Sequence, residues 1–179
     1  MIFFTADQHF NHLNSKGAGI IQYQNRPFSD INEMNETLIT NWNRRITSSD
    51  LVYILGDFCF RNSDQFLKRL NGKKILIKGD HDQDPLRFKD QFVKIEKMEK
   101  ITEKGQTITL CHYCMRVWPK SHWNSWHLFA HSHGRLEPIG KSWDVGVDNN
   151  HFEVLSFDEI KLIMDTRPDN FNLVKNAHA

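Results

Sequence analysis

Aspartate and histidine side chains follow short apolar runs at several points in this sequence, and they are the residues best suited to chemistry. The clearest example is the mostly apolar run at residues 74–78, which ends at Gly79 and is followed by Asp80, His81 and Asp82. A glycine lets the chain turn sharply after a strand, and open α/β sheets bind ligands beyond the carboxyl ends of their strands. Because Asp and Gly are also common in turns, an ordinary polar loop is an alternative explanation of this stretch taken alone.

The same pattern recurs at four other places in the chain. Short apolar runs also lead into Asp7 and His9, into Asp57, into His112, and into the pair His131 and His133. A solvated loop has no physical reason to repeat this pattern, whereas Asp and imidazole are ligands that borderline divalent cations prefer. We therefore interpret the repeated Asp and His residues as metal ligands.

The candidate ligands are too numerous for one tetrahedral ion. In chain order they are Asp7, His9, Asp57, Asp80, His112, His131 and His133. Such a set suits two ions that share a bridging carboxylate, and two ions about 3.5–4 Å apart stabilise both the attacking and the leaving oxygen of a phosphoryl displacement. Mixed oxygen and nitrogen ligation favours Mn, Fe, Zn, Ni or Co over Mg or Ca.

The order of these motifs resembles one known family. The motifs are Asp7-x-His9, Gly56-Asp57, Gly79-Asp80-His81-Asp82, His112 and His131-x-His133. They strongly resemble the DxH, GD, GNH[D/E], H and GHxH pattern of the calcineurin-like metallophosphoesterases, particularly small bacterial or phage-encoded members, and the match spans residues 3–134. The resemblance implies an α/β fold, a four-layer α-β-β-α sandwich in which two mixed β-sheets are flanked by helices and the metal site lies at the strand ends.

The resemblance also implies a role for each motif residue. Asp7, His9 and His133 would hold the first metal, Asp80, His112 and His131 would hold the second, and Asp57 would bridge the two. His81 would contact the phosphate and protonate the leaving group. Asp82 would orient His81 and fix its tautomer.

Two positions depart from the family pattern. Residue 130 is Ala where the family has Gly, and this change is tolerated if the backbone φ angle there is negative. Residue 80 is Asp where the family has Asn. A carboxylate adds negative charge beside an anionic substrate, so Asp80 is expected to bind its metal more tightly and to weaken phosphate binding.

Two long loops, at residues 10–29 and 113–127, contain residues that could contact a substrate. Arg116 is the favoured phosphate-binding residue because it closely follows His112 and lies in an aromatic stretch; Arg26, Arg61 and Lys120 are alternatives. The loop tryptophans could stack on a base or form a small core of their own; they are Trp118, Trp123 and Trp126. The loop histidines His12 and His122 are not expected to bind metal.

The elements that must position these residues alternate between strands and helices. Strands are predicted at residues 2–5, 51–55, 73–78, 127–130 and 143–147, and an antiparallel hairpin at 92–103 and 107–111. Helices are predicted at residues 31–46 with Asp30 as N-cap, in a short segment capped by Ser63, and from the Ser156 capping box to about Met164. We expect a single domain over residues 1–168 and a loose tail over residues 169–179.

Composition narrows the class of protein. The 179 residues include 23 Lys and Arg against 22 Asp and Glu, a net charge of +1 that argues against bulk binding to nucleic acid or membranes. A small phosphorylated substrate, possibly a nucleotide, remains compatible with it. Three cysteines give no disulfide framework, and the sequence contains neither a membrane-spanning run nor a signal peptide, so a cytoplasmic location is expected.

The leading hypothesis is a hydrolase, a dinuclear-metal phosphoesterase that acts by direct attack of a metal-bound hydroxide. Phosphodiester or nucleotide-type substrates are favoured because the aromatic loop could hold a base, and a phosphomonoesterase is an alternative. A metal-binding scaffold or interaction module that has lost catalysis is another alternative, motivated by Asp80. A nuclease for long nucleic acids is disfavoured by the near-neutral charge.

Overall fold

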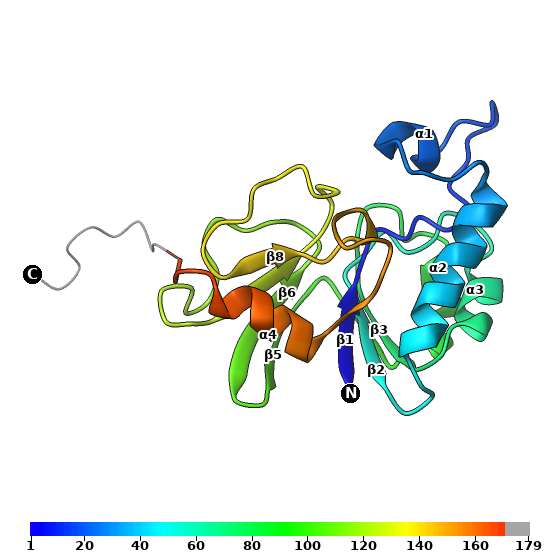
Figure 1. Cartoon of the computed structure of the whole chain (residues 1–179). Coiled ribbons are helices and arrows are strands. Elements are labelled where there is room, and N and C mark those ends of the chain that lie inside the picture. The colour runs from blue at the N-terminus through cyan, green and yellow to red at the C-terminus, as the bar shows by residue number, and fades with distance from the viewer. Residues whose placement is uncertain (171–179) are drawn as a thin grey trace, which may run out of the picture.

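The computed structural model describes residues 1–170 and contains two β-sheets packed between helices (Figure 1). The first sheet has the strand order β4-β3-β2-β1-β9. Its strands are β1 (Ile2–Thr5), β2 (Leu51–Ile54), β3 (Lys73–Ile77), β4 (Lys94–Glu96) and β9 (Leu155–Ser156). Strands β1 to β4 are parallel and β9 is antiparallel to β1, so the sheet is mixed.

The second sheet has the strand order β5-β6-β7-β8. Its strands are β5 (Met98–Glu103), β6 (Gln106–Cys111), β7 (Trp126–Phe129) and β8 (Ser142–Asp144). Strands β5 and β6 form the predicted antiparallel hairpin, and its turn residues Lys104 and Gly105 both have positive φ angles. Strands β6, β7 and β8 are parallel, so this sheet is mixed as well.

Helices flank the sheets. They are α1 (Ile20–Gln24), α2 (Ile31–Arg45), α3 (Ser63–Arg69) and α4 (Phe157–Asp165), with 3₁₀ helices at Pro85–Gln91 and Val147–Asn149. Figure 1 shows α2 and α3 on the side of the first sheet that faces away from the second, whereas α4 lies beside the second sheet. The Asp30 carboxylate accepts hydrogen bonds from the first turn of α2, and Ser156 and Glu159 form the predicted capping box of α4.

Side chains of the first sheet alternate between two apolar cores, as strand geometry requires. Phe3 and Ile54 lie in a core with α2 and α3, whereas their neighbours Phe4 and Leu55 lie in a core shared with the second sheet. Helix α4 adds buried side chains to this second core: Phe157, Ile160 and Met164. The expected sandwich of two mixed sheets flanked by helices is therefore confirmed.

Several predicted boundaries need correction. The loop expected at residues 10–29 contains helix α1, and α3 starts at Ser63 itself with Asn62 as its N-cap. The run at residues 92–103 is not one strand: it crosses between the sheets, with β4 pairing with β3 and β5 pairing with β6. A short strand before α4, β9, was not predicted because two residues carry no periodicity.

The expected tail lies mostly outside the described residues, which end at Asn170. Asn170 itself is not loose, since it donates hydrogen bonds to the backbone oxygens of Ser121 and Arg116 at 3.0 and 2.8 Å. Asp169 accepts a hydrogen bond from the backbone of Asn124 at 3.1 Å. These bonds attach the end of the described chain to the long loop at residues 113–125. No helix within residues 1–170 combines the length and apolar character needed to cross a membrane.

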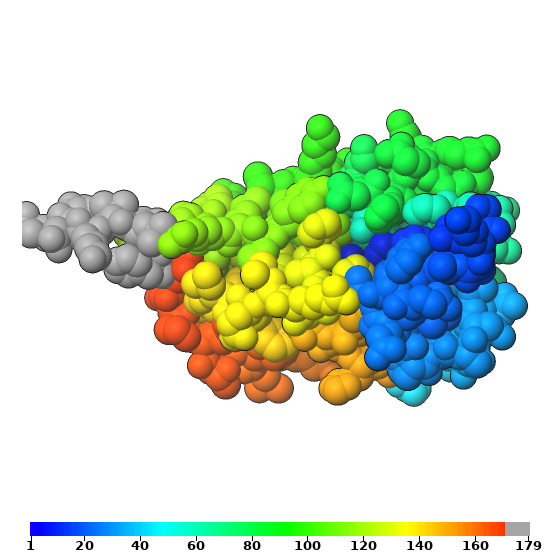
Figure 2. Space-filling view, turned by 90° about the horizontal axis from the view of Figure 1, so that it is seen from above, coloured from blue at the N-terminus to red at the C-terminus, as the bar shows by residue number. Residues whose placement is uncertain are grey.

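The parallel strands bring the candidate ligands to one edge of the molecule. Thr5 of β1 pairs with Ile54 of β2, and Ile54 pairs with Leu76 of β3, so the three strands end level with one another. Strands β6 and β7 are also parallel and end together. The loops that follow these strands gather on the face seen from above in Figure 2. Residues separated widely in the sequence thus meet at the carboxyl ends of both sheets.

Candidate metal centre

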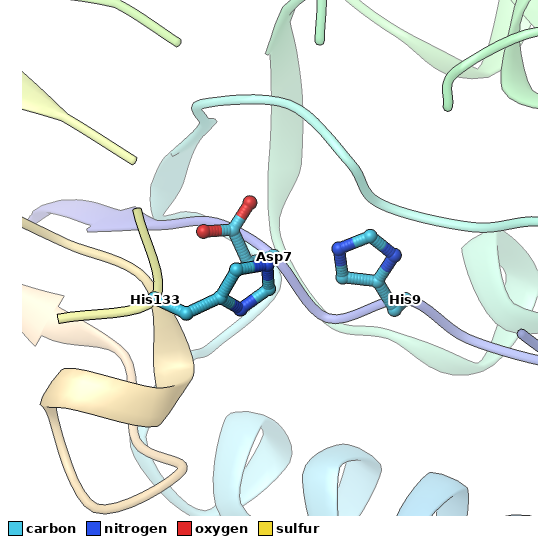
Figure 3. Close-up of side chains that lie close together, drawn as sticks. All are labelled: Asp7, His9 and His133. Carbon is cyan, nitrogen blue, oxygen red and sulfur yellow. The ribbon is translucent and has the colours of Figure 1, made fainter. Parts of the chain in front are cut away.

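Within residues 1–170, one group of possible metal ligands consists of Asp7, His9 and His133. Their ligand atoms lie within 4.8 Å of one another. Asp7 and His9 follow β1, and His133 reaches them from the loop after β7 (Figure 3). Asp7 and His9 are buried, and the side chain of His133 is 10% exposed. This group matches the ligand set predicted for the first metal.

A second group consists of Asp57, His112 and His131, again with ligand atoms within 4.8 Å of one another. These residues follow β2, β6 and β7, so both sheets contribute. Asp57 and His112 are buried, whereas the side chain of His131 is 52% exposed. The second group is therefore more open to solvent than the first.

Asp57 lies between the two groups. Its Oδ2 atom is 3.6 Å from Nε2 of His9 and 3.6 Å from Nε2 of His112. Its other oxygen, Oδ1, accepts a hydrogen bond from the backbone N–H of His81 at 2.9 Å. One carboxylate oxygen thus faces both groups, as a bridging ligand would.

The side chains fit a pair of divalent cations. Three buried ligand atoms have no hydrogen-bond partner among the described residues: Asp7 Oδ1, His9 Nε2 and His112 Nε2. Buried polar atoms are rarely left without a partner, and a bound ion supplies one. In His112 the opposite nitrogen, Nδ1, lies 2.7 Å from the backbone oxygen of Leu55. Donation of its proton to that oxygen leaves the Nε2 lone pair free for a metal.

The ligand backbone is strained. Five ligand residues have positive φ angles, between 50° and 68°: Asp7, His9, Asp57, His131 and His133. This region disfavours residues with a side chain, and such strain persists mainly at functional sites. Ala130, in contrast, is not among the residues with positive φ, so its methyl group is tolerated as expected.

Two glycines allow the ligand loops to approach one another closely. A Cβ atom at Gly79 would lie 2.4 Å from Oδ1 of Asp57, and one at Gly56 would lie 2.6 Å from the backbone nitrogen of Gly79. Both distances are far below van der Waals contact. The Gly-Asp pairs recognised in the sequence therefore serve to let the loops after β2 and β3 meet at the site.

The electrostatics of the first group favour a cation. Burial raises the pKa of Asp7 well above its ordinary value, and repulsion from Asp144, Asp57 and Asp148 raises it further. Burial lowers the pKa of His9 well below its ordinary value, and the Arg26 charge lowers it further. Burial thus favours the neutral, metal-binding form of the His9 imidazole, and a bound cation would stabilise the charged form of the Asp7 carboxylate.

Asp80, predicted as a ligand of the second metal, lies at the edge of the site. Its side chain is 49% exposed, and its Oδ2 is 3.7 Å from Nδ1 of His131. Its Oδ1 accepts a hydrogen bond from the hydroxyl of Tyr113. This bond lowers the pKa of Asp80 and raises that of Tyr113 to about 12. Asp80 is thus near the second group but engaged by a tyrosine that the sequence analysis did not single out.

His81 and Asp82 are both at the site, but the hydrogen bonds of the Asp82 carboxylate go to backbone N–H groups and not to the His81 ring as predicted. The exposed His81 ring lies 5.5 Å from that of His9. The buried Asp82 carboxylate instead accepts hydrogen bonds from the backbone N–H groups of Gly79, Asp57 and Phe58 at 2.7–3.1 Å. Asp82 therefore holds the loops after β2 and β3 together, and its effect on the site passes through the backbone.

His12, which was not expected to bind metal, is in neither ligand group but lies beside the first. Its Nδ1 is 3.0 Å from Nδ1 of His9, and its ring stacks on Phe60 with a centroid distance of 4.3 Å. The His12 and His81 rings are 5.6 Å apart. Burial lowers the pKa of His12 to about 4, with a further contribution from His81. The spacing of three residues between His9 and His12 was the available signal.

Several of the arginine and tryptophan residues proposed to contact a substrate have other surroundings than predicted. Arg26 is buried and bound to Asp148 instead of facing a substrate. Arg116 is exposed, and within residues 1–170 its side chain makes no hydrogen bond or ion pair. Trp118 and Trp126 are buried, whereas Trp123 is 69% exposed. Among the described residues, Arg116 thus has no hydrogen bond or ion pair with the metal ligands, and its role in substrate binding stays a prediction; two of the three tryptophans serve as core.

Buried aspartates outside the predicted set support the loop that carries His131 and His133. Asp144 accepts hydrogen bonds from Ser132 Oγ at 2.7 Å and from the backbone of Gly134 at 2.9 Å. Asp148 Oδ2 lies 2.7 Å from Nδ1 of His133. Asp148 directly follows the strand predicted at residues 143–147, which was an available signal, whereas Asp144 lies inside that predicted strand and had none.

Comparison with known proteins finds a relative that is itself uncharacterized. No protein-family model matches the chain. The uncharacterized protein MJ1445 of Methanocaldococcus jannaschii is 34% identical over an alignment of 179 positions that covers 90% of each chain. The chain therefore belongs to the family of this uncharacterized protein.

One solved structure shares the fold. The protein of unknown function AQ665 from Aquifex aeolicus superimposes with a TM-score of 0.70 at 25% identity, covering 91% of this chain and 98% of that one. A conserved uncharacterized protein of Streptococcus pneumoniae TIGR4, described as a predicted phosphoesterase, reaches a TM-score of 0.40 at 12% identity over 79% and 64% of the chains. The second similarity is too weak to support an inference.

Proposed function

We propose that the chain is a metal-dependent phosphoric ester hydrolase with a dinuclear metal site. The observation that carries the proposal is the placement of Asp57 between two groups of ligands, with one oxygen 3.6 Å from both His9 and His112. The partnerless ligand atoms at the same place support it, because a protein core rarely leaves such atoms unpaired. The motif order in the sequence supports the choice of phosphoesters as substrates.

The first ion would be held by Asp7, His9 and His133, the second by Asp57, His112 and His131, with Asp57 common to both. When bound, such ions would polarise the phosphoester and lower the pKa of a water molecule. Mixed Asp and His ligation favours Mn, Fe, Zn, Ni or Co. Asp80 would join the second ion if its carboxylate rotates away from Tyr113.

His81 is the residue suited to general acid catalysis. Its ring is exposed at the entrance of the site, and its backbone N–H donates to Asp57 at 2.9 Å, which fixes the loop relative to the ligands. The imidazole would give its proton to the oxygen of the departing group. Asp82 would assist by holding the backbone of Gly79 and Asp57 in place.

We further propose a small phosphorylated substrate, with phosphodiester or nucleotide-type compounds favoured over monoesters. The near-neutral net charge of +1 disfavours long nucleic acids. Aromatic side chains lie around His81 and its neighbour His12: the half-buried ring of Phe60 is 5.5 Å from that of His81, and the exposed ring of Tyr23 is 5.9 Å from that of His12. They supply the flat apolar contact that the buried Trp118 and Trp126 do not offer.

The test is metal analysis of the purified protein combined with turnover assays. The panel contains phosphomonoesters, nucleotides, cyclic nucleotides and aryl phosphodiesters, each with and without chelator. We expect two divalent ions per chain and hydrolysis that chelator abolishes and added metal restores. Hydrolysis that persists in excess chelator, or failure to hydrolyse any phosphoester with both ions bound, would contradict the proposal.

The second candidate function is a metal-binding scaffold without turnover. The observation that favours it is Asp80, where the hydrogen bond with Tyr113 occupies a predicted ligand oxygen. A scaffold would bind metal and hydrolyse no phosphoester. The exposed His81 ring beside His9 argues for the enzyme, because a scaffold has no need of a proton donor at that place.

A further inference from the structure

The guanidinium group of Arg26 is completely buried next to the first group of ligands. Its side chain is 0% exposed, and it forms a two-pronged ion pair with Asp148: Nε to Oδ1 at 2.7 Å and Nη2 to Oδ2 at 2.6 Å. It also donates to the backbone oxygens of Asp7 at 2.6 Å and Gln8 at 3.0 Å. One side chain therefore fixes the backbone that carries Asp7 and, at the same time, Asp148.

Asp148 connects this cation to a metal ligand. Its Oδ2 lies 2.7 Å from Nδ1 of His133, so that nitrogen donates its proton to the carboxylate and Nε2 keeps its lone pair. Arg26 balances the charge of Asp148, which would otherwise add to the repulsion among the carboxylates around Asp7. Arg26 and Asp148 thus hold two of the three ligands of the first group, Asp7 and His133, in a fixed arrangement.

Asp57 of the second group is held by Asp82 and by the His81 backbone, but among the described residues no buried ion pair lies behind the histidines of this group. His112 is oriented by the neutral backbone oxygen of Leu55 at 2.7 Å, not by a carboxylate. The His131 side chain is 52% exposed, and that of Asp80 is 49% exposed. A site whose ligands are already fixed loses less conformational freedom when it binds an ion. The two positions should therefore differ in affinity.

We propose that Arg26 and Asp148 are positioning residues that pre-organise the first metal position, formed by Asp7, His9 and His133. This position binds a divalent cation more tightly than the position formed by Asp57, His112 and His131. The second position fills at higher metal concentration. The inference rests on the metal-binding part of the proposed function and does not depend on which phosphoester is hydrolysed.

The experiment is a titration of the metal-free, full-length chain with Co²⁺. Binding is monitored by calorimetry and by the visible absorption of the bound cobalt. The native chain should show two binding events of different affinity. His133→Ala should abolish the tight event and His131→Ala the weak one, which assigns each event to a position.

The positioning role is then tested with Asp148→Asn and Arg26→Lys. Asn keeps an oxygen for His133 but loses the charge, and Lys keeps a charge but loses the two-pronged geometry. Each should weaken the tight event about 10- to 100-fold, the usual effect of removing the partner of a ligand. The weak event and its cobalt spectrum should not change. Asp148→Asn carries the test if Arg26→Lys does not fold.

Arg45→Lys is the matched control. Arg45 also connects distant segments, donating to the Val154 backbone at 2.7 Å and to Glu159 at 2.6 Å, but it contacts no ligand. This variant should lower thermal stability without changing either binding event.

The outcomes separate the inference from the proposed function. Native affinities in both Asp148→Asn and Arg26→Lys, or an equal loss in both events, would overturn the inference. A native chain that binds two ions as described but hydrolyses no phosphoester would overturn the proposed function and leave the inference standing. A native chain that binds no cobalt would overturn both.

Discussion

The Oδ2 atom of Asp57 lies 3.6 Å from Nε2 of His9, although these residues follow different strands and are 48 positions apart in the sequence. The same oxygen is also 3.6 Å from Nε2 of His112, which belongs to the other sheet. Ligand bonds to ions such as zinc are roughly 2.0–2.2 Å long, so atoms this far apart can bind a common ion. Asp57 is therefore the residue on which both proposed metal positions would depend.

Replacement of Asp57 by Ala should weaken binding at both metal positions and abolish turnover. The reason is that one oxygen of this carboxylate lies 3.6 Å from a histidine of each ligand group. Metal content by elemental analysis and turnover of an aryl phosphodiester provide the measurement. Asp64→Ala, in an exposed ion pair with Lys68, is the control and should behave like the native chain. Retention of two ions by Asp57→Ala would show that the bridging assignment is wrong.

Replacement of His81 by Ala should reduce turnover while leaving the metal content unchanged, because the His81 ring belongs to neither ligand group. General acid catalysis contributes about 100-fold to 10,000-fold. The loss should shrink for aryl esters, whose leaving groups need little protonation, and remain large for alkyl esters. An equal loss for both kinds of ester would indicate phosphate binding by His81 instead of proton donation.

Replacement of Asp80 by Asn should give a faster enzyme that binds phosphate or vanadate more tightly. A carboxylate near the substrate repels its charge in a poorly solvated site, and it partly neutralises the adjacent ion, which then acidifies water less well. Turnover, inhibitor affinity and metal content should be compared at matched metal concentration. If the Asp form is equal or faster, Asp80 is a working feature of this enzyme.

Tyr113→Phe separates the effect of the Asp80 charge from that of its hydrogen bond, since the Tyr113 hydroxyl donates to Asp80. In the native background this change should free the carboxylate and alter turnover. In the Asp80→Asn background it should have a smaller effect, and a double-mutant cycle measures the difference. Purely additive effects would show that Tyr113 does not act through Asp80.

The contribution of Lys74 to the free energy of unfolding should increase as the pH rises from about 8 to 10.5. The buried Lys74 ammonium donates to the backbone oxygens of Leu70 and Gly72, and burial lowers its pKa from 10.5 to about 8. Below pH 8 both states carry the proton and the cost of burying the charge is fully present. Between the two pKa values the unfolded chain binds more protons than the folded chain, so the free energy of unfolding increases with pH.

The measurement for Lys74 is denaturant unfolding of the native chain and of Lys74→Met at pH 7 and at pH 10. Other groups titrate over this range, so the informative quantity is the difference between the two proteins at each pH. The stability of the native chain relative to Lys74→Met should rise with pH. A difference that stays constant would show that Lys74 keeps its ordinary pKa.

The sequence alone identified the elements whose signal is local. The apolar spacing of residues 31–46, the cap at Asp30 and the capping box at Ser156 define helices through contacts within a few residues of the chain. Helix α1 and strand β9 were not predicted because each has too few residues to show a helical or strand-like spacing of apolar side chains. The crossing at residues 96–98 was missed because a strand of either sheet has the same pattern.

The sequence also determined which residue types stand at the strand ends, since each apolar run is followed by Asp or His. Six of the seven predicted ligands do form the two groups, and the seventh, Asp80, lies beside the second. These ligands can be recognised in the sequence because the apolar pattern of a strand and the residues that follow it lie within a few positions of one another. The sequence did not fix how far apart these side chains are.

Only the tertiary structure decided which residues support the ligands. Arg26 and Asp148 are 122 positions apart, and either alone reads as a surface charge in the sequence. In the folded chain they form a buried ion pair, and Asp148 contacts His133. Folding also places the Asp82 carboxylate next to backbone N–H groups instead of the His81 ring. The physical reason is that a ligand's type is set by its own chemistry, whereas its orientation depends on partners that folding brings from remote parts of the chain.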